Sequence, residues 1–322
     1  METINHLKEY ILTVHPVRKN DRDKAEFRAW ATSELKRAGW RVREETYGKF
    51  NGSVNLVAGD PERAEVFICA HYDTPSRMLV PNFVSPTNVP AHICYHLALA
   101  VLLVVFAFAA SLAVSFPLNQ PKLMLPLFAI LAVGLLWISA RGPANKNNAN
   151  GNSSGVAALL AMARTVKDHK RVCLVLTDNN SKNMLGASSF KKRHIEQASQ
   201  RLFINLDCVG DGEHMLLMPS KYSRWDGALL DALEGAFQSG EEIQARVLSQ
   251  GLVYYPSDHR KFKFHVAICA CRRLAGLGYY IPNLNTGRDT VMSEKNILFL
   301  SGGMQKFLEC YLASGEKAGA DT

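Results

Sequence analysis

Two long stretches of the chain consist almost entirely of apolar residues. Residues 96–116 carry no permanently charged side chain over 21 positions, and residues 123–140 repeat this over 18. As helices these stretches would be roughly 31 and 27 Å long, close to the roughly 30 Å thickness of a bilayer core. A pair of buried core helices is the weaker alternative, because globular helices normally keep a polar stripe. The pattern predicts an inserted two-helix transmembrane hairpin over residues 91–140.

Basic residues near the ends of these stretches indicate which side of the membrane holds the rest of the chain. The connecting turn, "PLNQPK", contains one basic residue, Lys122. Three more lie beyond the outer ends of the hairpin: Arg77, Arg141 and Lys146. Basic residues are enriched on the cytoplasmic side, and the first residues lack the long apolar run of a signal peptide. We therefore expect an integral membrane protein with a cytoplasmic soluble domain.

Outside the hairpin, short apolar runs alternate with stretches of helical periodicity. The runs "SVNLVAG", "AEVFICA", "VCLVLTD" and "LFINLDCVG" are typical of strands. The segments "GVAALLAMARTVKD", capped by Ser153 or Ser154, and "ASSFKKRHIEQA" are typical of helices. This alternation predicts an α/β protein, a three-layer α/β/α sandwich around a mostly parallel mixed sheet. Residues 1–90 and 141–313 would form one domain, and residues 314–322 a disordered tail.

The segment "CAHYDTP" places candidate metal-site residues at the end of a predicted strand. His71 and Asp73 project to the same side, because side chains in a strand alternate with period two. A ligating imidazole usually has its second ring nitrogen held by a carboxylate or carbonyl. Asp178 and Asp207 end two later strands, and ligands of such sheets bind at the carboxyl ends of the strands. These residues therefore predict one site.

Composition narrows the possible partners. With 322 residues, 48% of them hydrophobic, the chain can bury a large core. The net charge of +8 comes from basic residues scattered along the chain, which argues against nucleic acid and fits a membrane-proximal surface. Seven cysteines form no CxxC pair and lie mostly in apolar runs, as reduced cysteines do.

Four motifs occur in an order that resembles a known family. They are "NLVAGDPERAEVFICAHYDTP", "NGNSSGVAALLAMAR", "FINLDCVGDG", and "PSDHRKF" followed by "PNLNTGRDT". Together they resemble the di-zinc exopeptidases, which include bacterial leucyl aminopeptidases, glutamate carboxypeptidase and the transferrin receptor ectodomain. The resemblance spans most of residues 20–312, with the hairpin inserted after the first motif. It implies a zinc-exopeptidase fold with five metal ligands and one general base.

Two of these ligand positions keep residues that suit zinc. The resemblance places the first ligand at His71, supported by Asp73, and a later aspartate ligand at Asp207. The aspartate of the last motif remains as Asp289, in a supporting position. An imidazole and one carboxylate are fewer protein ligands than a catalytic zinc normally has.

At the other four positions that the family uses, the residues present cannot act as zinc ligands or as a general base. The bridging aspartate falls on Gly151, the general base on Asn180, the next ligand on Ser181 and the last histidine on Asn285. Zinc prefers thiolate, imidazole and carboxylate ligands, and an amide cannot take a proton from water near neutral pH. The resemblance therefore implies a degenerate metal site, for which we expect no cofactor.

These expectations favour a membrane-anchored pseudopeptidase that binds a peptide, an amino-acid-like ligand or a protein partner. The alternative is an active zinc-dependent aminopeptidase with a rearranged metal site. Asp178 would then be the possible substitute base, with Asp258 and His259 as further candidates. A serine nucleophile at Ser153 in "GNSSG" is a weaker hypothesis, because a polar loop precedes it where a nucleophile elbow needs a strand.

Overall fold

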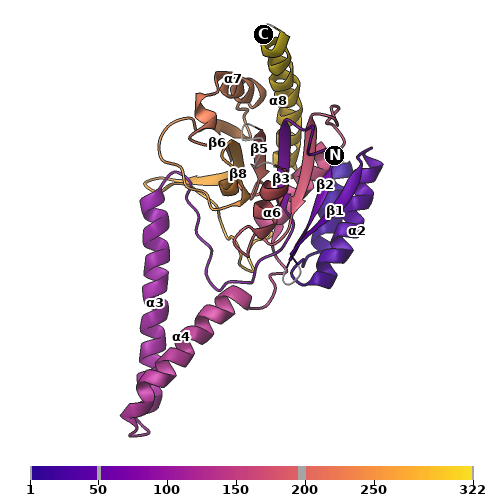
Figure 1. Ribbon diagram of the computed structural model, residues 1–322. Coiled ribbons are helices and arrows are strands. Elements are labelled where there is room, and N and C mark those ends of the chain that lie inside the picture. Colours follow the sequence, from indigo (N-terminus) through magenta and orange to yellow (C-terminus); the bar gives the residue numbers. More distant parts are fainter. Residues whose placement is uncertain (1, 49–51, 195–200, 321–322) are drawn as a thin grey trace.

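The computed structural model describes residues 2–48, 52–194 and 201–320, and within them a nine-stranded mixed sheet forms the centre of the molecule (Figure 1). The strands are β1 Val42–Tyr47, β2 Ser53–Ala58, β3 Val66–His71, β4 Val172–Thr177, β5 Leu202–Leu206, β6 His214–Pro219, β7 Gln244–Val247, β8 His265–Leu274 and β9 Gly278–Tyr280. Their order is β1-β2-β4-β3-β5-β8-β6-β7, with β9 beside β8. The central neighbours β4, β3, β5 and β8 run parallel, whereas β1, β2, β6 and β9 join by antiparallel pairing.

Helices cover both faces of this sheet. One face carries α1 Glu2–Glu9, which continues as a π-helical turn over Tyr10–Val14, together with α2 Asp21–Arg37, α5 Ser154–Met162, α7 Gly227–Ala236 and α8 Glu294–Ala320. The other face carries α6 Leu185–His194 and a 3₁₀ turn over Asp258–Lys261. The predicted α/β/α architecture is confirmed.

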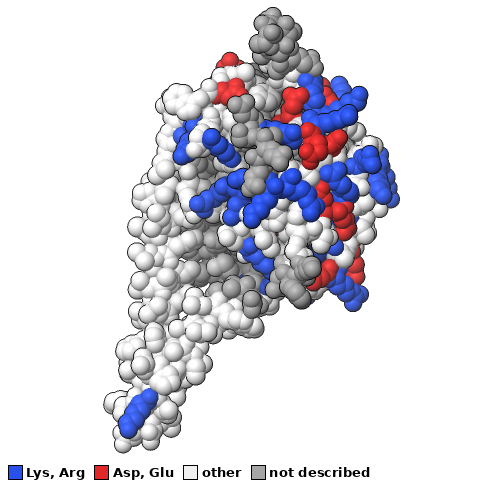
Figure 2. Space-filling model, viewed as in Figure 1, with Lys and Arg blue, Asp and Glu red and all other residues white. Residues whose placement is uncertain are grey.

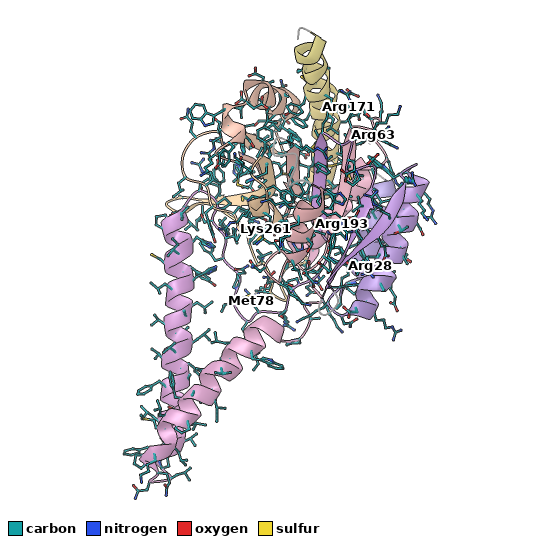
Figure 3. All side chains as sticks on the ribbon, in the orientation of Figure 1. Arg28, Arg63, Met78, Arg171, Arg193 and Lys261 are labelled. Carbon is teal, nitrogen blue, oxygen red and sulfur yellow. The ribbon has the colours of Figure 1, made fainter. Side chains whose placement is uncertain are left out.

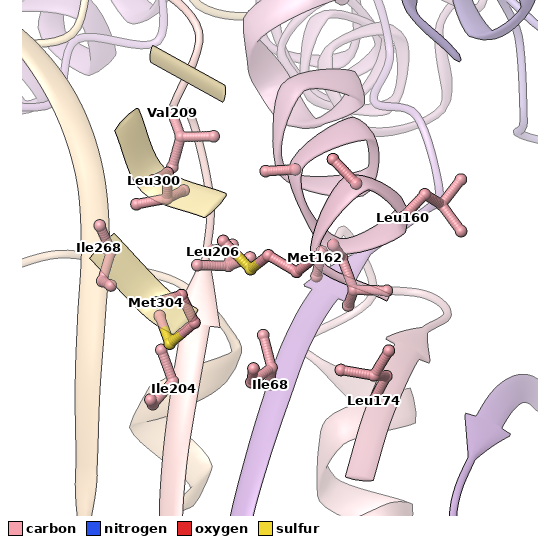
Figure 4. Packing of buried hydrophobic residues seen from close by; sticks show 14 of the residues in the cluster. Ile68, Leu160, Met162, Leu174, Ile204, Leu206, Val209, Ile268, Leu300 and Met304 are labelled. Atoms are coloured by element: carbon pink, nitrogen blue, oxygen red, sulfur yellow. The ribbon is translucent and has the colours of Figure 1, made fainter. Parts of the chain in front are cut away.

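The core shows why the apolar runs form strands. In β3, Ile68 packs toward α5 and α8, where Met162 and Met304 meet the sheet (Figure 4), and its neighbour Phe67 packs on the opposite face against Phe190 of α6. A strand buried on both faces has a continuous apolar sequence, because successive side chains pack into the helical layers on opposite faces of the sheet.

The hairpin leaves this domain between β3 and β4. Its helices are α3 Val89–Ser115 and α4 Met124–Arg141, joined through a 3₁₀ turn over Pro121–Leu123, and they extend away from the sheet (Figure 1). In the most apolar windows of the two helices, 11% and 0% of the residues are buried. The sheet and the other described helices of this chain therefore do not bury the two helices.

Three boundaries differ from the sequence-based expectation. Helix α3 begins at Val89, well before the apolar run, because the Asn88 side chain accepts the Ala91 N–H and caps it. Helix α5 is not capped by a serine: the Asn152 side chain accepts the Gly155 N–H. Helix α8 continues to Ala320, past the expected start of a disordered tail at residue 314, since Ala, Glu and Lys extend an existing helix readily.

Candidate functional site

The carboxyl ends of β3, β4 and β5 line one side of a cavity of about 520 Å³. All six positions that the resemblance assigns to metal or base lie in its wall: His71, Gly151, Asn180, Ser181, Asp207 and Asn285. They come from segments far apart in sequence, brought to one edge by the parallel arrangement of the central strands. The structure therefore brings together the positions that the motif order singled out.

His71 lies between two carboxylates at the bottom of this cavity. Its Nδ1 is 3.3 Å from Asp73 Oδ1, and its Nε2 is 3.5 Å from Asp207 Oδ1. All three side chains are buried. Burial works against a charged imidazole, but Asp207 and Asp73 outweigh it and raise the pKa of His71 well above its usual value. An imidazolium at this position supplies positive charge to both carboxylates.

Asp73 also holds the loop that replaces the catalytic glutamates. Its carboxylate accepts the backbone N–H of Asn180 at 2.9 Å and of Ser181 at 3.2 Å, and the Ser181 hydroxyl at 2.8 Å. The Asn180 side-chain amide donates to Asp258 Oδ1 at 2.8 Å. The two positions that would carry the base and a ligand are thus hydrogen-bonded to neighbouring aspartates.

Asp258 is a buried carboxylate on the far side of Asn180. Besides the Asn180 amide, it accepts the hydroxyl of Thr177. Burial raises the pKa of Asp258 to about 6, although these hydrogen bonds and the charge of His71 favour its ionised form. The sequence offers both Asp258 and His259 as further candidates for a rearranged site. Of the two, Asp258 contacts Asn180, the position assigned to the general base. His259 instead lines a second cavity, described below.

Leu284 packs against Gly151, the position that the resemblance assigns to the bridging carboxylate. A Cβ atom added at Gly151 would lie 2.3 Å from Leu284 Cδ1, far inside van der Waals contact. The backbone around Gly151 is fixed by Asp289, which accepts the N–H groups of Asn150 at 2.7 Å and Gly151 at 3.2 Å. Burial raises the pKa of Asp289 to about 7. Asp289 thus holds the backbone of the loop that contains Gly151. It faces no carboxylate at position 151, because that residue is a glycine.

Asp178, the possible substitute base, is not part of the cavity wall, although its partner Lys24 is. Its carboxylate forms a buried ion pair with Lys24 Nζ of α2 at 2.6 Å and accepts the Val54 N–H at 3.2 Å. In the structure Asp178 is therefore paired with Lys24 of the covering helix, whereas His71 is paired with Asp73 and Asp207.

Several residues of the site could not be recognised from any motif or spacing pattern in the sequence. Lys19 and Lys182 line the cavity, as does Tyr255, whose hydroxyl donates to the backbone oxygen of Asp207 at 3.1 Å. Arg18 is fully buried behind His71 and donates to the backbone oxygens of Tyr72 and His15. A lone arginine or lysine in a loop carries no spacing pattern, so only the tertiary arrangement shows it.

The donor set at this site does not fit zinc. Among the described residues, no group of three or more His, Cys, Asp or Glu side chains is placed to hold a metal ion. His71 and Asp207 are the residual ligand types, and the neighbouring positions offer a hydroxyl, amides and the methyl group of Leu284. A catalytic zinc normally takes three protein ligands of the imidazole, thiolate or carboxylate kind.

Solved structures with this fold are zinc exopeptidases and related enzymes. A Zn-dependent exopeptidase from Parabacteroides distasonis has a TM-score of 0.59 at 15% identity, covering 96% of this chain and 97% of that one. A glutaminyl cyclase from Porphyromonas gingivalis gives 0.58 at 15% identity, with 96% and 97% covered. A leucine aminopeptidase precursor from Bacteroides thetaiotaomicron gives 0.55 at 15% identity, with 96% of each chain covered.

The sequence itself also matches a peptidase family. Residues 138–272 match the profile of peptidase family M28. No curated protein matches the chain in sequence. The predicted resemblance to the di-zinc exopeptidases is confirmed, and the domain has the zinc-peptidase-like fold of that family.

Proposed function

We propose that this protein is a membrane-anchored pseudopeptidase that binds or scaffolds and does not hydrolyse peptides. The main support is the chemistry of the cavity wall: Gly151, Ser181 and Asn285 stand at three positions that the resemblance assigns to metal ligands, and none of them offers an imidazole or a carboxylate. The hydrogen bonds of Asn180 and Ser181 to Asp258 and Asp73 support it further, because they engage the groups that stand where the family has its base and a ligand. His71 forms ion pairs with both remaining carboxylates and offsets part of their charge.

The retained cavity suits a small polar ligand. It keeps a volume of about 520 Å³ and is lined by Lys19, Lys182 and apolar side chains such as Met78 and Val84. A basic side chain beside an apolar wall can bind the carboxylate and side chain of a peptide or amino-acid-like molecule. A protein partner that inserts a chain terminus into this cavity fits the same chemistry.

The exposed hairpin supports membrane anchoring. Its surface carries large apolar side chains such as Leu102, Phe106 and Ile130, each more than half exposed to solvent. Two helices of this length and composition lie most favourably in a bilayer. The single basic residue of the turn, Lys122, against Arg77 and Lys146 at the outer ends, favours a cytoplasmic domain.

Zinc content tests the loss of the metal site. The full chain, purified in detergent without chelator, is expected to contain far less than one zinc per chain by elemental analysis, before and after incubation with zinc. The matched positive control restores the ligands as Gly151→Asp, Ser181→Glu and Asn285→His, with Leu284→Ala to make room. We expect this variant to gain zinc. Zinc bound to the natural chain and lost in His71→Ala would overturn the proposal in favour of an active aminopeptidase.

Membrane anchoring and orientation are tested on the same chain. Alkaline carbonate should leave the protein in the membrane pellet. Cys310 is exposed on α8 of the soluble domain, so a membrane-impermeant maleimide should label it only after the cells are permeabilised. Release by carbonate would contradict anchoring, and labelling of Cys310 in intact cells would contradict the cytoplasmic orientation.

A further inference from the structure

A second cavity, of about 590 Å³, lies on the face of the domain where basic side chains gather (Figure 2). It is formed by the segment after β6, the loop before the 3₁₀ turn Asp258–Lys261, and the residues that follow this turn; Lys261 is labelled there in Figure 3. Its wall contains six basic residues: Lys191, Lys221, Arg224, Arg260, Lys261 and Lys263. None of the residues in the wall is acidic.

The charges of this basic cavity are not balanced by the protein. In the part of the chain that the structure describes, no acidic side chain forms a salt bridge with any of the six. Lys221 and Lys263 instead lie over the ring of Tyr222, with Nζ 4.9 and 4.5 Å from its centroid. Six like charges around one hollow repel one another, so an anion inside it would be strongly attracted.

The same wall contains a buried histidine that packs on an aromatic side chain. His259 is 5% exposed and lines the cavity, and its Nδ1 has no hydrogen-bond partner among the described residues. The ring stacks on Tyr255, with centroids 5.7 Å apart, and so forms part of the rigid wall of the cavity.

The basic cavity lies beside the start of the hairpin. His92, in the first turn of α3, packs on Tyr254 of the cavity wall with ring centroids 5.0 Å apart. The uninterrupted apolar run begins at Leu97, five residues further, which is roughly 7.5 Å along the helix. The headgroup layer of a bilayer is roughly 5–7 Å deep on each side of the hydrocarbon. A bilayer around the hairpin would therefore bring its headgroups level with the cavity.

We propose that the basic cavity binds the phosphorylated headgroup of an anionic membrane lipid. This inference rests on the membrane anchoring proposed above. Arg260 can pair with phosphate oxygens, and the lysines add positive charge. Arg224 donates to the backbone oxygens of Pro219 at 3.2 Å and Gly251 at 2.9 Å, so it contributes mainly its charge. Leu252, 75% exposed at the rim, offers an apolar contact for the acyl chain. Anionic lipids are concentrated in the cytoplasmic leaflet, on the side where the domain is proposed to lie.

Binding of short-chain lipids to the full chain in a neutral detergent tests this site. Dioctanoyl phosphatidylglycerol is expected to bind saturably, and dioctanoyl phosphatidylcholine is not. The variant Lys221→Gln/Lys261→Gln/Lys263→Gln should lose roughly a hundredfold in affinity, since each basic residue near an anionic surface contributes about fivefold. The matched control removes three exposed lysines outside both cavities, Lys36→Gln/Lys170→Gln/Lys306→Gln, and should change affinity less than about twofold because distant charges are screened.

Each other outcome overturns the proposal in a distinct way. Equal binding of the two lipids would mean that the headgroup charge is not recognised. An equal loss in the control variant would mean that the net charge of the chain, rather than the basic cavity, binds the lipid. Inorganic phosphate that displaces the lipid at lipid-like concentrations would assign the site to a soluble phosphate compound. Because this assay needs no bilayer, its result is independent of the carbonate extraction and of the zinc content.

Discussion

Two histidines in this protein each lie between two carboxylates, and they differ in where they occur. His71 contacts Asp73 and Asp207 at the strand ends, at a family metal position. His194, at the end of α6, contacts Glu45 at 2.9 Å and Glu62 at 2.8 Å, away from the cavity. In both, burial works against the charged ring, but the neighbouring carboxylates raise the pKa of the histidine.

A histidine between two carboxylates therefore does not require a metal. His194 has no relation to a metal position, yet its ring contacts two acids as the ring of His71 does. The difference lies in burial: Asp73 and Asp207 are both buried, whereas the Glu62 side chain is 67% exposed. The ion pairs of His71 with Asp73 and Asp207 can therefore stabilise the fold without a metal, and His71 should matter more for stability than His194.

Replacement of His71 should have the largest effect on stability. His71→Ala leaves Asp73 and Asp207 buried without their cation, so we expect the free energy of unfolding to fall by about 3–5 kcal/mol. Urea unfolding of the full chain in detergent measures this. The double variant His71→Ala/Asp207→Asn should recover part of the loss, because one of the unpaired charges is gone. An unchanged unfolding curve together with a loss of bound zinc would instead show that His71 is a metal ligand.

Glu45, which pairs with His194, should make the next largest contribution to the unfolding free energy, and this contribution should depend on pH. Burial tends to raise the pKa of Glu45, but hydrogen bonds from His194, Tyr47 and Arg43 lower it from 4.5 to about 2. A lowered carboxyl pKa stabilises the fold above the unfolded pKa, and this stabilisation is lost as the pH falls through the folded pKa. Glu45 should therefore contribute up to about 3 kcal/mol above roughly pH 4.5, of which roughly half is lost by about pH 3.

The variant Glu45→Gln isolates this contribution. The difference in unfolding free energy between the natural chain and Glu45→Gln should shrink as the pH is lowered from about 5.5 to about 3. The raised pKa of His194 acts in the opposite direction: its stabilisation is complete below about pH 6.5 and is lost as the pH rises through the folded pKa. A difference that does not change with pH would show that Glu45 contributes through packing and not through its charge.

Replacement of His194 should cost less than replacement of His71. His194→Ala leaves only Glu45 buried, and Tyr47 and Arg43 still donate to it. We expect a loss of about 1–2 kcal/mol, measured in the same urea titration. A loss equal to that of His71→Ala would contradict the argument that burial of the second carboxylate sets the difference between the two sites.

The fold and the outline of the site could be predicted because they depend on local patterns. Strands buried on both faces give continuous apolar runs, and the motif order fixed which strand ends meet at one edge. The obstruction at Gly151 could not be predicted, because Leu284 reaches it only through tertiary packing. The pairing of Asp178 with Lys24 is equally a contact between distant elements. Such contacts have no spacing signature in the chain.

The clustering of basic residues around the basic cavity could not be predicted from the sequence either. Along the sequence its basic residues belong to three separate segments, around residues 191, 221–224 and 260–263, and they appear scattered. The sheet brings these segments to one face, where the charges lie around a single hollow. Net charge and its distribution along the chain could therefore indicate a membrane-proximal surface but could not locate a site.

Removal of the basic cavity's lysines should have the smallest effect on stability. The charges of Lys221, Lys261 and Lys263 have no acidic partner among the described residues, in contrast to His71 and His194. Lys221→Gln/Lys261→Gln/Lys263→Gln should change the unfolding free energy by less than about 0.5 kcal/mol, or stabilise the chain slightly by reducing repulsion. The same urea titration measures it. A loss comparable to that of His194→Ala would mean that these lysines hold the fold together, and a fall in lipid affinity could then reflect unfolding.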